Sequence, residues 1–86
     1  MANKSVVYAT DVKFFDKNGR ELRFPNIEVA KKAIDIVEIY AELEQLSEHP
    51  KIGWSKDGIT TSWIISIMQN GKALDIETCN TIYRVI

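Results

Sequence analysis

The sequence predicts an α+β domain in which a single antiparallel sheet of four to five strands packs on one long helix, in the order β-β-α-β-β-β. An amphipathic run from Pro25 to Pro50 predicts the helix, and alternating apolar residues with glycine turns on both sides of it predict the strands. A helix of about 22 residues and a strand of about 10 residues both span roughly 33 Å, so the two match in length. We expect residues 1–86 to form a single domain.

The predicted helix has clear end signals. Asn26 is a plausible N-cap, and Pro50 favours an end near Ser47 or Glu48. The apolar side covers about half the circumference, which is wider than one flat sheet usually requires. Ile39 projects near the polar side. Either loops and flanking strands wrap the helix edges, or one edge belongs to an interface.

The N-terminal part predicts a bulged hairpin. Residues Val6 to Phe15 alternate as a strand, and Asp16–Gly19 suits a type I turn with glycine at the left-handed position. This register places two apolar pairs opposite each other, Phe14 with Leu22 and Val12 with Phe24.

The part after the helix predicts further hairpins. A short strand, Ile52–Trp54, leads through a Ser55–Gly58 turn into a long strand, Ile59–Met68, and Asn70-Gly71 favours a two-residue turn. A final strand covers 82–86. The register places Ile67 opposite Leu74 and Ile65 opposite Ile76, with Trp63 continuing this core row.

The opposite face of the sheet would then be too apolar to remain exposed. It would hold Ile64 and Met68, Trp54 opposite Thr60, and Phe15 from the first strand. Solvated sheet faces are normally polar, apolar patches mark interfaces, and tryptophan is enriched at binding hot spots. We therefore predict a protein interface at Trp54, Ile64, Met68 and Phe15 on this sheet face, at Ile39 on the helix edge, or at both. The alternatives are a register shifted by one residue, or loops that cover these side chains.

Composition narrows the class of protein. The net charge of −1 indicates neither a nucleic-acid footprint nor a polyanion. One cysteine, Cys79, forms no internal disulfide, and no signal peptide or run of about 18 apolar residues is present. We expect a cytoplasmic protein without a membrane span.

A second reading concerns the basic hairpin at residues 12–24. Its charge is +2, and it interleaves Phe15 with basic residues that are candidates for contact with nucleic acid: Lys13, Lys17, Arg20 and Arg23. The alternative is that Asp16 and Glu21 pair with these side chains on a solvated ribbon.

Catalytic and metal chemistry have little support. His49 and Cys79 are the only residues of their types, no third group orients them, and a metal site needs three or four ligands. Asp75 and Glu77 share a strand face, as solvated acids commonly do. We expect no enzyme activity, no cofactor and no metal.

These observations favour a non-enzymatic protein–protein interaction or inhibitor module that forms a homodimer. In size and α+β make-up the chain resembles the small inhibitors that phages carry against host defence systems, anti-CRISPR proteins among them. This resemblance implies an inhibitor and rests on no motif. A nucleic-acid-associated module using the hairpin 12–24 is the alternative.

Overall fold

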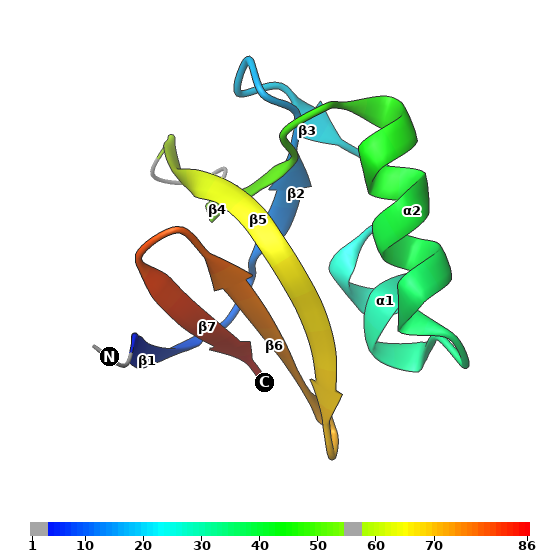
Figure 1. Cartoon of the computed structure of the whole chain (residues 1–86), viewed down its shortest axis with the longest axis vertical. Coiled ribbons are helices and arrows are strands. Elements are labelled where there is room, and N and C mark those ends of the chain that lie inside the picture. The colour runs from blue at the N-terminus through cyan, green and yellow to red at the C-terminus, as the bar shows by residue number, and fades with distance from the viewer. Residues whose placement is uncertain (1–3, 55–57) are drawn as a thin grey trace.

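The protein is a curved seven-stranded sheet with two short helices on one side (Figure 1). The computed structural model describes residues 4–54 and 58–86. Its elements in chain order are β1 (Ser5–Ala9), β2 (Lys13–Phe15), β3 (Glu21–Leu22), α1 (Ile27–Lys32), α2 (Ile36–Leu46), β4 (Lys51–Trp54), β5 (Ile59–Asn70), β6 (Ala73–Thr78) and β7 (Thr81–Val85).

The strands lie in the order β1-β7-β6-β5-β4-β2-β3. All neighbours are antiparallel except β1 and β7, which are parallel. The prediction of a four- to five-stranded antiparallel sheet on one long helix is therefore wrong. The sheet is mixed, and the expected first strand is divided at Thr10–Val12, where Asp11 has a φ of 57°.

The predicted helix is interrupted after its second turn. Ala33 adopts an extended conformation (φ −65°, ψ 136°), and Asp35 begins α2 by accepting a hydrogen bond from the N–H of Val37. The side-chain amide of Gln69 in β5 donates to the carbonyl oxygen of Ala33 at 2.9 Å. This carbonyl, which has no helical partner because of the interruption, therefore still accepts a hydrogen bond. The end signals were read correctly, because Asn26 caps α1 and Ser47 follows α2.

The first hairpin has the predicted bulged turn. The N–H of Gly19 donates to the carbonyl of Asp16, and Gly19 has a φ of 85°. Phe14 lies opposite Leu22, as predicted. The second predicted pair is absent, because β3 ends at Leu22 and Phe24 is exposed.

The second predicted register is wrong for two reasons, a turn that comes later than predicted and a bulge in β5. Ile67 pairs with Ile76, and the β5–β6 turn comprises Gly71 and Lys72, one residue later than predicted. The pairing shifts between Ile64 and Ser66, where Ile65 is the extra residue. The bulge therefore directs Ile64 into the core and leaves Ile65 outside.

The sheet curls so that β4 approaches β7, although β5 and β6 separate them in strand order. The Trp54 and Tyr83 rings meet edge to face at 5.8 Å, and the Trp54 indole N–H donates to the carbonyl of Thr10 at 2.9 Å. Trp54 pairs with Ile59, whereas Thr60 pairs with Gly53, which explains why Trp54 does not face outward as predicted. Residues 55–57 of the predicted turn lie outside the described residues.

The core lies between the helices and the inner face of this sheet. Its fully buried centre combines one helix residue with residues from four strands (β2, β4, β6 and β7), namely Leu43, Phe14, Ile52, Leu74, Ile76 and Val85. The helices thus cover the inner face only, and the outer face stays open over β5.

Candidate protein-binding surface

An exposed apolar row follows β5 on the outer face of the sheet. We call Trp63, Ile65 and Met68 the β5 stripe; they are 47%, 46% and 64% exposed. Ile64 and Ile67 point inward at 3% and 7% exposure, so the bulge between them is what places two successive residues, Ile65 and Ser66, on the outer side.

Aromatic rings border one end of the β5 stripe. The ring centroid of His49 lies 5.0 Å from that of Trp63. Phe15 and Trp63 both pair with Lys51, so the three side chains form one cross-strand row on the outer face. Phe15 is nonetheless buried in this row, with 7% exposure.

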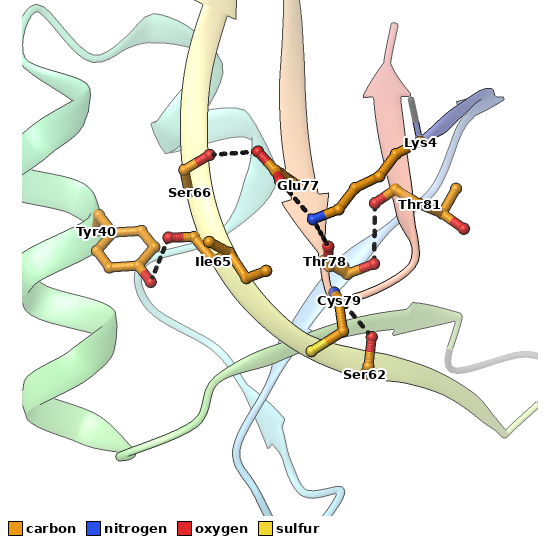
Figure 2. Close-up of polar contacts among 9 residues, drawn as sticks. All are labelled: Lys4, Tyr40, Ser62, Ile65, Ser66, Glu77, Thr78, Cys79 and Thr81. Atoms are coloured by element: carbon orange, nitrogen blue, oxygen red, sulfur yellow. Dashed lines mark hydrogen bonds and ion pairs between the residues drawn. The ribbon is translucent and has the colours of Figure 1, made fainter. Parts of the chain in front are cut away.

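Tyr40 of α2 fixes the bulge from the side of the helices. Its hydroxyl is 3.0 Å from the carbonyl oxygens of Ile64 and of Ile65, and it donates to this pair of acceptors. Figure 2 shows the contact with Ile65. Desolvation by burial raises the pKa of Tyr40, and the nearby negative charge of Glu44 raises it further. The phenol is therefore a neutral donor at physiological pH.

A polar network borders the β5 stripe on the side of β6. The guanidinium of Arg84 contacts Asp75 at 2.8 and 3.0 Å, and Lys4 pairs with Glu77, which also accepts from Ser66 (Figure 2). The hydrogen bond from Arg84 lowers the pKa of Asp75, and that from Lys4 lowers the pKa of Glu77. Both carboxylates are therefore ionised and paired with cations. A catalytic carboxylate pair instead shares one proton between its two members, so Asp75 and Glu77 do not suit that role.

The residues predicted to form the interface do not lie together on one exposed surface. Ile39 and Ile64 belong to the buried core, at 8% and 3% exposure, and Phe15 is buried as well. Trp54 is partly buried against the core. Met68 is exposed on the outer face, where the sequence placed it.

Sequence reasoning missed Trp63 and Ile65, which it assigned to the core. Three successive apolar residues, 63–65, carry no alternation, so periodicity alone does not determine which of them points inward. The signal present was the excess of apolar residues on both faces of this strand, and it predicted an exposed patch without identifying its members.

The predicted nucleic-acid contacts are spread around the first hairpin. Lys13 and Lys17 lie 3.5 Å from Glu21 and Glu48, respectively. Arg23 lines an open groove of about 800 Å³ between the hairpin and α1. The groove holds as many acidic as basic side chains: Asp11, Glu21 and Glu28 against Lys13, Arg23 and Lys31. It is therefore not a basic channel.

The other chemical candidates, His49 and Cys79, contact different neighbours. The backbone N–H of Cys79 donates to the Ser62 hydroxyl (Figure 2), while His49 contacts Trp63. Among residues 4–54 and 58–86, no group of three or more metal-ligating side chains is close enough to hold an ion. Within the same ranges, no helix is long and apolar enough to cross a membrane.

Comparison with known proteins yields no relative. No protein-family model, no curated protein and no solved structure matches this chain.

Proposed function

We propose that this chain is a non-enzymatic protein–protein interaction module that binds a partner protein through the β5 stripe. One observation carries the proposal: three large apolar side chains, 46–64% exposed, stand in a row on a sheet face that neither helix covers. Sheet faces left in water are normally polar, and contiguous apolar patches mark binding sites.

The surroundings of the β5 stripe suit this role. Asp75 and Glu77 already pair with Arg84 and Lys4, so a partner meets a polar border without leaving an unpaired buried charge. An apolar centre that includes a tryptophan, with a polar rim, is the usual anatomy of a protein interface. An inhibitor is one form of such a module, and the reducing cytoplasm suits the single cysteine.

The experiment is affinity capture from a lysate of cells that produce the protein, with three forms of the chain. A stripe variant combines Trp63→Ala with Met68→Ser, and a control variant carries Ile34→Ser, which changes a fully exposed apolar residue at the corner between the helices. We expect the wild type and the control to retain the same partner and the stripe variant to lose it. A partner that the stripe variant retains equally well would contradict the proposal.

Binding of nucleic acid through the first hairpin is the second candidate. It is supported by Arg20 and Arg23, both exposed and without an ion pair among the described residues. Salt-dependent retention on heparin that Arg20→Glu with Arg23→Glu abolishes would favour it, because release of counterions dominates such binding. Retention unaffected by these changes would exclude this hairpin.

A further inference from the structure

The N-terminal strand β1 is an open edge of the sheet. It pairs with β7 on one side, and no other described strand pairs with it (Figure 1). Natural edge strands are protected by charged residues, prolines or bulges. Ser5–Ala9 contains none of the three, and Val6, Val7 and Tyr8 are 43%, 44% and 65% exposed.

The direction of the backbone groups on β1 follows from one hydrogen bond. The N–H of Ile86 donates to the carbonyl of Ala9, so the polar backbone groups of Ala9 point toward β7. Because these groups alternate along a strand, those of Val7 also point toward β7. The N–H and C=O groups of Val6 and Tyr8 therefore point toward the open edge, four groups in all.

The spacing of these four groups is self-complementary. In an antiparallel pair of β1 strands with a twofold axis at Val7, Val6 lies opposite Tyr8 of the second copy, and Tyr8 lies opposite Val6 of that copy. Residues in a hydrogen-bonded pair exchange both of their N–H···O bonds. All four outward groups are satisfied in this register.

The side chains suit the same register. Val6 pairs with Ile82 and Tyr8 with Arg84 in β7, so both side chains lie on the outer face, with Val7 on the inner face. Apolar side chains would then meet across the twofold axis, since Val6 adjoins the aromatic ring of Tyr8. The Arg84 guanidinium lies 5.7 Å from the centre of that ring, which holds Tyr8 in place.

No charge opposes this pairing. Arg84 is neutralised by Asp75, and Lys4, at the start of the strand, donates to Glu77 and to the carbonyl of Thr78. An acidic or basic peptide would find no complementary charge on Ser5–Ala9, whereas a second copy of this chain would find a neutral match.

We infer that β1 joins two copies of this chain into a dimer with one continuous sheet. The contact is confined to a five-residue strand and is smaller than the roughly 800 Å² per partner of standard interfaces. We therefore expect a reversible dimer with a dissociation constant in the micromolar range or weaker. Two strands, β7 and β6, separate this site from the β5 stripe, so it does not depend on the proposed function.

Sedimentation equilibrium of the intact chain, from about 10 μM to about 1 mM, tests the inference, because a weak dimer responds to concentration. We expect the wild type to shift from monomer to dimer over this range. The double variant Val6→Lys with Tyr8→Lys faces like charges across the axis, and its dissociation constant should rise at least about tenfold. The matched variant Val6→Glu with Tyr8→Lys faces opposite charges and should dimerise, more strongly at low salt.

Each outcome bears on the inference. A wild type that stays monomeric throughout would overturn it, and so would equal dimerisation by the two charged variants when both show native circular dichroism. The stripe variant, with Trp63→Ala and Met68→Ser, should dimerise like the wild type. Loss of dimerisation in that variant alone would move the contact to the β5 stripe and overturn the role of β1.

Discussion

Two neighbouring isoleucines provide a direct test of the bulge in β5. Ile64 is 3% exposed within the core, whereas Ile65 is 46% exposed on the outer face. Burying an isoleucine side chain contributes about 1.5–3 kcal/mol, and its truncation to alanine within a core, including the cavity left behind, costs about 2–5 kcal/mol. We expect Ile64→Ala to lower the free energy of unfolding by that larger amount.

The matched change, Ile65→Ala, should cost about 1 kcal/mol or less, because roughly half of this side chain is already in water and no enclosed cavity forms. Urea unfolding followed by circular dichroism measures both free energies. The free energy of unfolding of the whole domain is on the order of 4–13 kcal/mol, so Ile64→Ala could leave it unfolded. In that case Ile64→Val, which costs about 0.5–1.5 kcal/mol, is the milder substitute. A larger loss for Ile65→Ala than for Ile64→Ala would refute the bulged register.

Three further predictions concern other positions. Gly53→Ala should destabilise the protein by about 1–3 kcal/mol in thermal unfolding, since an added Cβ would lie 2.4 Å from a backbone oxygen of β5; an unchanged melting temperature would contradict this packing. Hydrogen bonds from Arg84 and from Lys4 lower the pKa of Asp75 and of Glu77, respectively, below the ordinary values of 3.8 and 4.5. Their stabilisation is therefore complete above about pH 5 and lost as the pH falls through their folded-state pKa values, so Asp75→Asn should flatten the decline of stability with acid measured by urea titration. Asp35→Ala removes the N-cap of α2 and should cost about 1 kcal/mol in the same assay, whereas a gain would indicate that the two helices fuse.

Local signals in the sequence were read correctly where the physics is local. The Asp16–Gly19 turn needs a residue at positive φ, and Gly19 supplies it. The cap at Asn26 needs a short side-chain oxygen within reach of the following N–H groups. Each of these features is determined by a few consecutive residues, which explains why inspection of the sequence identified them.

The features that were missed depend on contacts between distant residues. The parallel pairing of β1 with β7 joins segments 76 residues apart, and nothing within either segment specifies it. The interruption at Ala33 is supported by Gln69, and the bulge at Ile65 by Tyr40. An amphipathic pattern predicts that a helix exists, but it does not reveal that a later strand supplies a partner for a freed carbonyl.

The bulge also connects the core to the candidate site. Without the extra residue, Ile65 would point inward with Ile67, and Ile64 would lie outside in its place. Trp63 would also turn inward, so Ile64 and Met68 would replace the β5 stripe on the outer face. Apolar side chains would still lie on both faces, because the run from Trp63 to Ile65 is apolar throughout. The excess of apolar surface is therefore a property of the composition of this strand, whereas its location follows from the bulge, whose carbonyl oxygens accept from the Tyr40 hydroxyl. It follows that Tyr40→Phe, which removes that hydroxyl and leaves the ring, tests the location of the surface separately from its existence.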